Sequence, residues 1–320
     1  MTLVLSRGDL LAVLDPEACV ASLREGFRRA GTVGARGGAP VDGLRIRTDL
    51  PFPGTATALI PGVLPGIEAY TVKVNAKFPG ARPALRGVVC LHSGQDGELL
   101  ALMDSATVTA WRTGLAAALG THLLAPADPA GGAVLGVIGA GAQAEIAVGG
   151  LRRLRRFRDL AVHDIDPARA ADFTSRHGGR TVASAARVAA AADIVVLATW
   201  SRAPLLRAAD TRPGQHLTTL GADEPGKQEL AADLLETGLL VVDDRDLAAD
   251  MGALAAAGLP PAAAVTLGEI LRGDHPGRTH AAERSVYAPV GLPWQDLAIA
   301  WTAYQRARQL GVGTRVDLLS

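Results

Sequence analysis

The sequence predicts an α/β protein of two domains, one built on a doubly wound parallel sheet and the other of α+β type. Three observations lead to this fold class. Strands and helices alternate after residue 132, as in a parallel sheet with helical crossovers. Short strands broken by Gly and Pro dominate residues 44–102 instead. The chain has 320 residues, and single hydrophobic cores stop growing at about 250–300 residues.

The first domain is expected to span residues 1–125 and to be completed by residues 285–320. Apolar residues at helical spacing predict a helix over 9–31, with a restart at Asp15-Pro16. Further strands are expected at Tyr70–Phe78, Gly87–His92 and Leu99–Met103, and helices at Thr107–Leu124 and Gln295–Leu310. We expect the last helix to pack on the first domain.

Apolar and polar residues alternate along Tyr70–Phe78, so Val72 and Val74 point one way and Lys73 and Asn75 the other. Lysine is rare in this chain, with three among 32 basic residues, and Asn75 is its only asparagine. An ammonium is a compact charge with a tunable pKa, which arginine cannot replace. We therefore expect the segments that contain the three lysines to be those in which the chemistry needs an ammonium.

The second domain is expected to span residues 126–284, after the linker-like segment 125–132. The alternating pattern predicts strands at Ala133–Ile138, Leu160–His163, Ile194–Ala198, His216–Leu220 and Leu239–Val242, and helices at Ala142–Phe157, Pro167–His177 and Ala185–Ala192. Strands that alternate with helices in this way indicate a parallel sheet covered on both faces.

A dinucleotide motif opens this second domain. Residues 133–145 read AVLGVIGAGAQAE, an apolar strand followed by a Gly-x-Gly turn and a helix. The glycines permit a tight turn and the close approach of a pyrophosphate to the helix N-terminus. This strand–turn–helix context indicates a Rossmann-type fold with a cofactor site at Gly139, Gly141, Ala142 and Gln143.

An acidic residue follows the second strand. Asp164 can accept hydrogen bonds from both ribose hydroxyls and would repel a 2′-phosphate, which favours NAD over NADP. Asp166 adds negative charge there. The Asp166-Pro167 pair is also a good helix start, so we assign Asp166 to the N-cap of that helix and Asp164 to the ribose.

Composition argues against several other classes of protein. Acidic and basic residues balance at 32 each, with a sequence pI of about 7.1, which gives no reason to expect nucleic acid or an anionic membrane as partner. The seven histidines and two cysteines show no metal-ligand spacing, so we expect no metal. The N-terminal residues lack the pattern of a secretory signal, and we expect a cytoplasmic protein.

Seven stretches of the chain together have a family pattern, namely RTDLP (47–51), VKVNAKFPG (72–80), GELLALMDSATVTAWRTGLAAALGTHLLA (97–125), GVIGAGAQA (136–144), GADEPGKQEL (221–230), LGEILRG (267–273) and GLPWQDLA (291–298). In these stretches the chain resembles the ornithine cyclodeaminase/mu-crystallin family along most of its length. The resemblance implies an N-terminal substrate-binding and dimerisation domain, completed by the C-terminal helix, and a Rossmann domain, assembled as a homodimer.

The resemblance assigns roles to individual residues. It implies that Arg47, Lys73 and Arg112 hold a substrate carboxylate, although Arg45 lies on the same side of an alternating strand and could replace Arg47. It also implies that Arg112 and Thr113 contact the cofactor. We further include Thr199 and Gly221 in the cofactor site, and Val290 and Gly291 in the substrate site.

The segment GADEPGK is the most informative for catalysis. Asp223 lies at the carboxyl end of an expected parallel strand, where open α/β sheets bind ligands. The resemblance implies that Asp223 is an acid/base on the substrate amine, with Lys227 in the substrate site beside it and Lys73 as a second catalytic group. The alternative is a turn aspartate before Pro225-Gly226.

The chain departs from the cyclodeaminase pattern in two places. Residues 60–63 read IPGV and lack the acid that orients a distal amine, and Arg86 stands where a neutral residue is usual. Both changes favour a substrate whose side chain is neutral or acidic. Alternatively, Arg86 pairs with Glu68 or Asp104 and does not meet the substrate.

Three functions follow. The first is an NAD-dependent amino acid dehydrogenase or ketimine reductase that moves a hydride at the α-carbon of a small L-amino or imino acid. The second is an ornithine-type cyclodeaminase, which forms a cyclic imino acid such as proline and releases ammonia. The third is a ligand-binding protein like mu-crystallin, a branch that lacks the acid at the position of Asp223. The sequence does not name the substrate.

Overall fold

The computed structural model describes residues 1–30, 43–78, 80–81 and 83–318, which form two compact units. The first unit is Met1–Arg112 with Leu292–Ser320, and the second is Thr113–Gly291. These bounds differ from the expected 1–125 with 285–320 and 126–284. The second half of helix α3 (Ser105–Leu124) packs within the second unit, where Thr121 lies 2.6 Å from Thr218, and strand β14 (Ser285–Tyr287) lies inside that unit's sheet.

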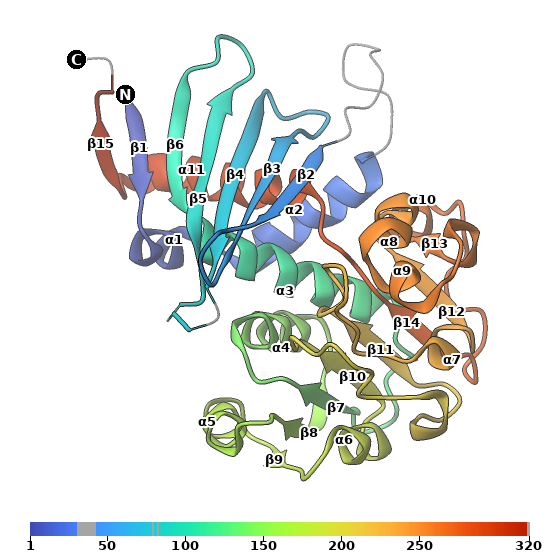
Figure 1. The fold of residues 1–320 in the computed structure, drawn as a ribbon. Coiled ribbons are helices and arrows are strands. Elements are labelled where there is room, and N and C mark those ends of the chain that lie inside the picture. Colours follow the sequence, from blue (N-terminus) through green and yellow to red (C-terminus); the bar gives the residue numbers. More distant parts are fainter. Residues whose placement is uncertain (31–42, 79, 82, 319–320) are drawn as a thin grey trace. The chain divides into compact units, whose positions relative to one another are not determined.

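The first unit contains a seven-stranded sheet (Figure 1). Strands β1 and β6 pair in parallel, and the other neighbours are antiparallel. In sheet order the strands are β15 (Thr314–Val316), β1 (Thr2–Leu5), β6 (Leu99–Asp104), β5 (Leu85–Ser93), β4 (Ala69–Lys77), β3 (Thr55–Gly62) and β2 (Leu44–Asp49).

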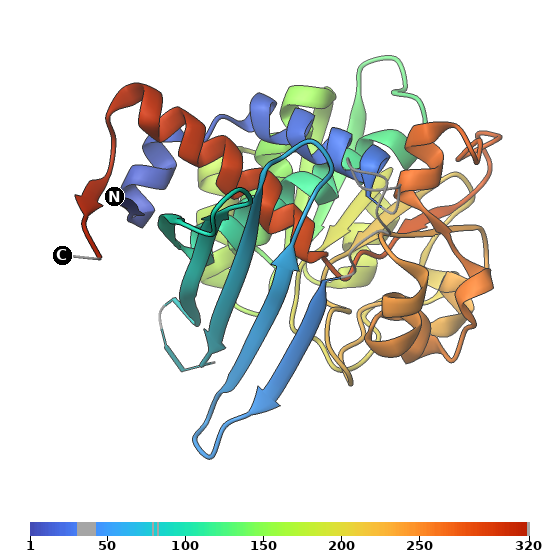
Figure 2. The same cartoon turned by 90° about the horizontal axis from the view of Figure 1, so that it is seen from above.

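Helices α2 (Pro16–Arg29) and α11 (Pro293–Leu310) lie together on one face of this sheet, as Figure 2 shows. The helix expected over 9–31 is two helices, α1 (Arg7–Val13) and α2, because Asp15 caps α2 by accepting a hydrogen bond from the Ala18 N–H. Gly26 lets α2 approach α11 closely, since a Cβ at Gly26 would lie 2.2 Å from the Trp294 ring. The C-terminal helix thus packs on the first unit, as expected.

The alternation along β4 is confirmed, but the buried face is the one that carries Lys73, and the exposed face is the one that carries Val74. Lys73 points toward the helices and is 1% exposed, whereas Val74 on the other face is 48% exposed. Large apolar side chains of β2 and β3 are also exposed, namely Leu44, Ile46 and Ile60. The helix-covered face therefore holds buried charge, and the opposite face is an exposed apolar surface.

The second unit contains an eight-stranded sheet in which all strands are parallel. In sheet order the strands are β13 (Val265–Thr266), β12 (Leu239–Val242), β14, β11 (His216–Thr219), β10 (Ile194–Leu197), β7 (Ala133–Ile138), β8 (Phe157–His163) and β9 (Arg180–Thr181). The helices are α4 (Ala142–Leu154), α5 (Pro167–His177), α6 (Ala185–Ala191), α7 (Ala232–Leu235), α8 (Arg245–Met251), α9 (Ala253–Ala257) and α10 (Leu267–Arg272), with short 3-10 helices at Ala208–Asp210 and Pro261–Ala263.

Apolar side chains of this sheet belong to two separate hydrophobic cores. Val134 and Ile138 of β7 belong to one cluster, which includes α6, and Leu135 and Val137 belong to the other, which includes α4 and α5. Because successive side chains of a strand point to opposite faces, helices cover both sides of the sheet. The predicted fold class, a doubly wound parallel sheet with an α+β domain, is confirmed.

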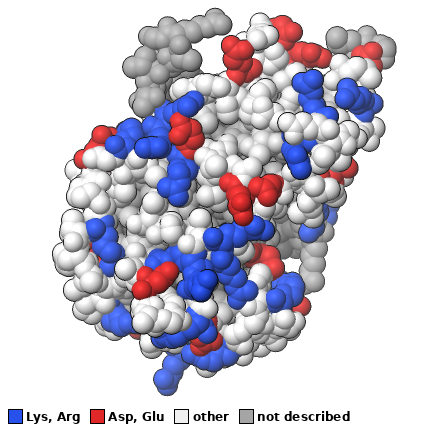
Figure 3. Space-filling model, turned by 180° about the vertical axis from the view of Figure 1, so that it is seen from behind, with Lys and Arg blue, Asp and Glu red and all other residues white. Residues whose placement is uncertain are grey.

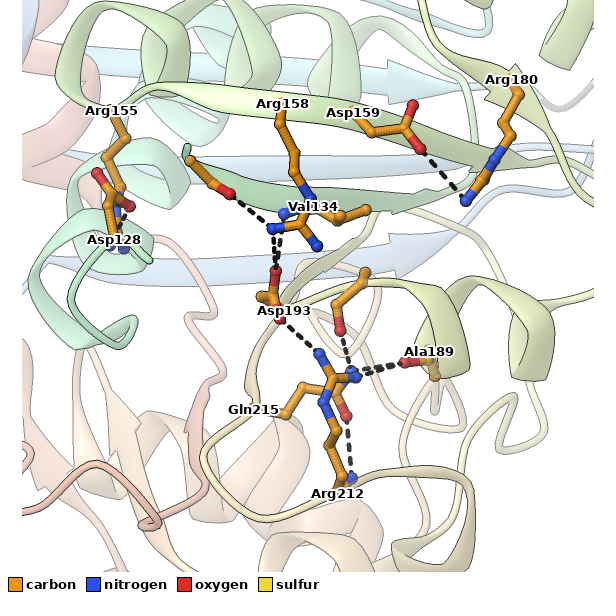
Figure 4. Close-up of polar contacts among 12 residues, drawn as sticks. Asp128, Val134, Arg155, Arg158, Asp159, Arg180, Ala189, Asp193, Arg212 and Gln215 are labelled. Atoms are coloured by element: carbon orange, nitrogen blue, oxygen red, sulfur yellow. Dashed lines mark hydrogen bonds and ion pairs between the residues drawn. The ribbon is translucent and has the colours of Figure 1, made fainter. Parts of the chain in front are cut away.

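A polar network joins the amino ends of the central strands in this unit (Figure 4). The Asp193 carboxylate accepts hydrogen bonds from the Val134 N–H at 2.8 Å and from Arg212 Nη2 at 2.6 Å. Gln215 donates to the carbonyl oxygens of Ala189 and Ala192. Asp193 therefore connects the start of β7 with the segments that precede β10 and β11, at the end of the sheet away from the glycine turn.

We expect Asp193→Ala to lower the free energy of unfolding by about 1–3 kcal/mol, because it leaves the Val134 N–H without its acceptor and removes the ion pair with Arg212. Urea unfolding measures this loss. Asp159→Ala is the control, since it removes an exposed ion pair with Arg180 (3.2 Å) worth about 0–1 kcal/mol. Equal losses in the two variants would contradict the assigned role of Asp193.

Acidic and basic side chains are interspersed over the face drawn in Figure 3, in keeping with the formal net charge of zero. Among the described residues, no helix has the length and apolar character needed to cross a bilayer. The same residues contain no group of three or more His, Cys, Asp or Glu side chains placed to hold a metal ion.

Candidate active site

The turn after β7 has the geometry that a pyrophosphate requires. Gly139 has a φ of 91°, and a Cβ there would lie 2.6 Å from the Ala198 carbonyl oxygen, so only glycine fits. Gly141 is the N-cap of α4, and no side chain caps the helix there. The first N–H groups of α4, at Ala142 and Gln143, are thereby left for an anion.

The RTG segment of α3 packs against this same helix start. A Cβ on Gly114 would lie 2.6 Å from Ile146 Cβ and 2.9 Å from the Gln143 carbonyl oxygen, so α3 contacts the first turns of α4 closely at this position. The neighbouring Thr113 hydroxyl is buried and has no hydrogen-bond partner among the described residues. Thr113 directly precedes the glycine that contacts this helix, and an orphaned hydroxyl at this position fits a phosphate oxygen.

Asp164 lies at the end of β8 and faces the glycine turn. Its carboxylate accepts hydrogen bonds from the Ala140 N–H at 2.7 Å and from the Asp166 N–H at 2.9 Å. A carboxylate offers about four acceptor positions, so it can still accept ribose hydroxyls. Asp166 accepts from the Ala168 N–H and is the N-cap of α5, as expected.

We expect Asp164→Ser to relax the preference for NAD over NADP, because serine removes the charge that repels a 2′-phosphate but can still accept from Ala140. The ratio of the two dissociation constants, from fluorescence titration, measures this. Asp166→Ser is the matched control: it keeps a helix cap and the Asp164 carboxylate, so it should change the ratio less than Asp164→Ser does. A wild-type protein that binds NADP as tightly as NAD would disprove the assignment.

A buried carboxylate holds the segments that follow β10 and β11. Glu229 is fully buried and accepts four hydrogen bonds of 2.6–2.7 Å, from the N–H and hydroxyl of Thr199, the Thr219 hydroxyl and the Gly221 N–H. Burial raises the pKa of Glu229, against the effect of these hydrogen bonds. Two predicted cofactor residues, Thr199 and Gly221, are therefore positioned by one side chain.

Asp223 and Lys227 form an ion pair just beyond β11. Lys227 Nζ lies 2.7 Å from Asp223 Oδ1 and 3.3 Å from a Glu224 carboxylate oxygen. Lys227 is buried, while Asp223 is about a quarter exposed. A cavity of about 330 Å³ adjoins this pair, with Arg202, Glu224, Lys227, Gln228, Asp250 and Met251 among its lining residues.

The predicted substrate residues Val290 and Gly291 are held by a second buried acid. Asp243, directly after β12, accepts hydrogen bonds from the Val290 N–H at 2.9 Å and the Gly291 N–H at 2.6 Å. Burial raises the pKa of Asp243. Gly291 has a φ of 97°, so the turn that leaves the second unit depends on glycine there.

In the first unit, Lys73 and Arg112 lie on either side of one carboxylate. Lys73 Nζ is 2.6 Å from Asp296 Oδ2, and Arg112 Nε is 3.5 Å from Asp296 Oδ1. Arg112 Nη1 also donates to Gln295 Oε1 at 3.4 Å. Burial lowers the pKa of Lys73 to about 8, although Asp296 acts in the opposite direction. Two predicted carboxylate ligands are thus brought together.

The strand register shows which of Arg45 and Arg47 lies in the same cross-strand row as Lys73. Arg45 pairs with Leu59, which pairs with Lys73, so Arg45 lies in the same cross-strand row as the lysine. Its charge contributes to the lowered pKa of Lys73. Arg47 lies one row further along and donates to Asp49 at 2.9 Å. Arg45 is therefore at least as good a candidate as Arg47 for the third cation.

Arg86 lies on the opposite face of the sheet from Lys73, because it pairs with Ala76. Its Nε donates to the Pro83 carbonyl oxygen. Glu68 instead accepts a hydrogen bond from Gln95, and Asp104 accepts two from Thr107. The face on which Arg86 stands argues against a contact with a substrate bound at Lys73.

The matched regions decide the family. The model of the ornithine cyclodeaminase/mu-crystallin family matches residues 50–311. The chain belongs to the ornithine cyclodeaminase/mu-crystallin family. Within it, the alanine dehydrogenase of Archaeoglobus fulgidus is 31% identical over 242 residues, which cover 73% of this chain and 74% of that protein.

Solved structures of relatives share the whole fold. An archaeal alanine dehydrogenase dimer with bound NAD is similar with a TM-score of 0.88 and 26% identity, over 99% of each chain. The Δ1-pyrroline-2-carboxylate reductase of Thermococcus litoralis, in complex with NADH and L-proline, has a TM-score of 0.89 and 27% identity, over 98% of this chain and 100% of that one.

Three buried acids of this family member were not predicted as site residues, namely Glu229, Asp243 and Asp296. Glu229 and Asp296 lie inside segments that carried the family resemblance, GADEPGKQEL and GLPWQDLA, and Asp243 directly follows a predicted strand. The signal available was an acid within an apolar or helical context. Glu229 pairs with Thr199 30 positions away, Asp243 with Val290 47 positions away and Asp296 with Lys73 223 positions away, and such pairings cannot be read from a single chain.

Proposed function

We propose that this protein is an NAD(H)-dependent amino acid dehydrogenase or ketimine reductase acting on a small L-amino or imino acid. The observation that carries the proposal is the buried group of Lys73, Arg112 and Asp296, in which two cations share one carboxylate. One positive charge is left over, which suits a single α-carboxylate of the substrate. The reductase and dehydrogenase relatives support the same reaction class.

The residues of the cofactor site support the proposal that the cofactor is NAD and not NADP. The glycine turn, the uncapped start of α4 and the orphaned Thr113 hydroxyl fit a pyrophosphate, and Asp164 fits an unphosphorylated ribose. When bound, NADH supplies a hydride to the α-carbon of an imino acid, and NAD accepts one from an amino acid. Glu229 fixes Thr199 and Gly221 at this end of the sheet.

The chain's own residues supply binding and proton transfer. Lys73 and Arg112, with Arg45 or Arg47, hold and orient the substrate carboxylate. Asp223 donates a proton to the substrate nitrogen as the imine is reduced, and takes it back in the reverse direction. The Lys227 ammonium, 2.7 Å away, holds the Asp223 carboxylate in place. A protein that only binds its ligand would not need an acid for proton transfer at this position.

A cyclodeaminase is the second candidate, and the family membership favours it. Against it stands the segment 60–63, which offers no acid for a distal ammonium. A screen of amino acids with NAD, and of pyruvate or cyclic imines with amine and NADH, separates the two. A dehydrogenase accumulates NADH from amino acid and NAD, and a ketimine reductase consumes NADH with an imine, whereas a cyclodeaminase releases ammonia without a net change in NADH. No change in NADH and no ammonia from any substrate would contradict both.

We further propose a homodimer formed through the exposed apolar face of the first unit's sheet. Leu44, Ile46, Ile60 and Val74 are 37–62% exposed on this face. Contiguous exposed apolar surface of this kind marks a protein contact. The relative solved as a dimer supports a second copy of this chain as the partner. A cytoplasmic location stays a prediction.

Light scattering is expected to give the mass of a dimer at micromolar concentration, and Val74→Glu should shift it to a monomer, because a charge cannot be buried without a partner. Leu11→Glu is the matched control, since Leu11 is 50% exposed on α1, away from this face. A monomeric wild-type protein at that concentration would contradict the proposal.

A further inference from the structure

We propose that Asp296 is the positioning residue of the substrate-carboxylate site: it holds Lys73 as an ammonium and fixes Lys73 and Arg112 for one substrate carboxylate. This inference rests on the proposed function for the identity of the substrate. It assigns to Asp296 a role through other residues, since its carboxylate contacts the two cations.

The geometry places Asp296 between the two cations. Both Asp296 and Lys73 are 1% exposed, and their contact of 2.6 Å joins residues 223 positions apart in the chain. Asp296 Oδ1 and Arg112 Nε lie 3.5 Å apart, and neither has a hydrogen-bond partner among the described residues. The Arg112 Nε–H can therefore donate to a substrate carboxylate, whereas Asp296 Oδ1 can accept only from a donor such as a water.

The sequence around Asp296 explains why it reaches this place. Asp296 lies in the first turn of α11, where a carboxylate is favoured by the helix dipole. It is the only acidic residue of that helix, and it is directed into the sheet beside apolar neighbours. An acid buried at the start of an otherwise apolar helix face is costly unless its partners are cations.

The charges around Lys73 can be counted element by element. Helix α11 contributes Asp296, α3 contributes Arg112 and β2 contributes Arg45. Its neighbours in the cross-strand row, Leu59 and Val89, are apolar. The buried trio of Lys73, Arg112 and Asp296 thus carries a formal charge of +1, and one bound carboxylate makes it neutral.

Without Asp296, Lys73 would face only positive charges in a site that burial already makes unfavourable for an ammonium. The pKa of Lys73, about 8 in the intact protein, would then fall further. Less of the ammonium would remain at neutral pH, and substrate affinity would be lost as the pH rises. This dependence on pH separates a role in charge from a role in packing.

The test uses the scarcity of lysine in this chain. Protein labelled with 13C at lysine Cε gives signals from only Lys73, Lys77 and Lys227, and Lys73→Met identifies that of Lys73. In Asp296→Asn we expect the pKa of Lys73 to be lower than in the wild type by about 1–3. Asp104→Asn is the matched control, because Asp104 caps α3 through Thr107 and does not contact Lys73. An unchanged Lys73 titration in Asp296→Asn overturns the proposal.

Kinetics on whichever substrate is found give a second measure. Asp296→Asn should raise KM more than it lowers kcat, and the loss in kcat/KM should be larger at pH 8 than at pH 6. A loss equal at every pH overturns the proposal. If Asp296→Asn does not fold, Lys73→Met is compared with Lys73→Met/Asp296→Asn, which removes both charges of the buried pair. Adding Asp296→Asn to Lys73→Met should then lower kcat/KM only a little further. A further large loss of kcat/KM overturns the proposal.

The two hypotheses fail in different ways. A wild-type protein that turns over no amino or imino acid contradicts the proposed function, whereas the lysine titration does not depend on turnover. A Lys73 signal that responds to Asp296→Asn in a protein without such activity would support the charge arrangement alone.

Discussion

Replacing Asp223 by asparagine is expected to lower kcat by about 10²- to 10⁴-fold, the usual contribution of general acid–base catalysis. Asparagine keeps the shape of the side chain and can still accept the hydrogen bond from Lys227, but it cannot carry a proton to or from the substrate nitrogen. Cofactor affinity should be unchanged and KM should change little. Steady-state kinetics with a fluorescence titration of NADH measure all three.

Glu224→Gln is the control for this result. It removes the other acid paired with Lys227, at 3.3 Å, without removing the proposed base, and we expect a much smaller loss of activity. A turn aspartate with no chemical role would behave differently, because asparagine is an equally good turn residue. Activity of Asp223→Asn within a few-fold of the wild type would remove Asp223 from the catalytic group.

Replacing Lys73 by alanine should lower kcat/KM by about 10- to 150-fold, the equivalent of about 1.5–3 kcal/mol for a charge-assisted contact to the substrate carboxylate. The protein should also lose stability, about 3–5 kcal/mol, because Asp296 stays buried without its closest partner. Affinity for NAD should be nearly unchanged, since Lys73 belongs to the first unit and the glycine turn to the second. Thermal unfolding and NAD titration accompany the kinetics.

Lys77→Ala is the matched control for Lys73→Ala. Lys77 lies on the same strand and the same face, four residues further along, but it is not among the charges that set the pKa of Lys73. We expect activity close to that of the wild type. Loss of the cofactor in Lys73→Ala with turnover of substrate retained would show that Lys73 has been assigned to the wrong site.

Local patterns predicted the second unit well. The strand Ala133–Ile138 and the helix Pro167–His177 have the predicted bounds, since continuous apolar runs and an Asp-Pro helix start are signals contained within a few residues. The family and the fold class were also predicted correctly. The helix after the glycine turn was predicted to end at Phe157 but ends at Leu154, because Arg155 is already extended and Phe157 begins β8.

Long-range pairing could not be predicted in the same way. The alternation along β4 indicated two faces but not which one would be buried, because that depends on the packing of α11 and on Asp296. The same holds for Glu229, whose role is defined by hydrogen-bond donors at two different strand ends. Such side chains are placed by the tertiary structure, and a local period contains no information about their partners.

The order in which the chain is synthesised has a consequence for the first unit. Its sheet is complete in sequence by residue 104, apart from β15, yet the carboxylate that neutralises Lys73 arrives 223 residues after that lysine. Until α11 emerges from the ribosome, an unpaired ammonium and an uncovered sheet face have to remain in water. The second unit is encoded between these two parts, so the helix that supplies the partner of Lys73 is translated after every strand of both sheets except β15. The buried pair of Lys73 and Asp296 can therefore form only after the whole of the second unit has been translated.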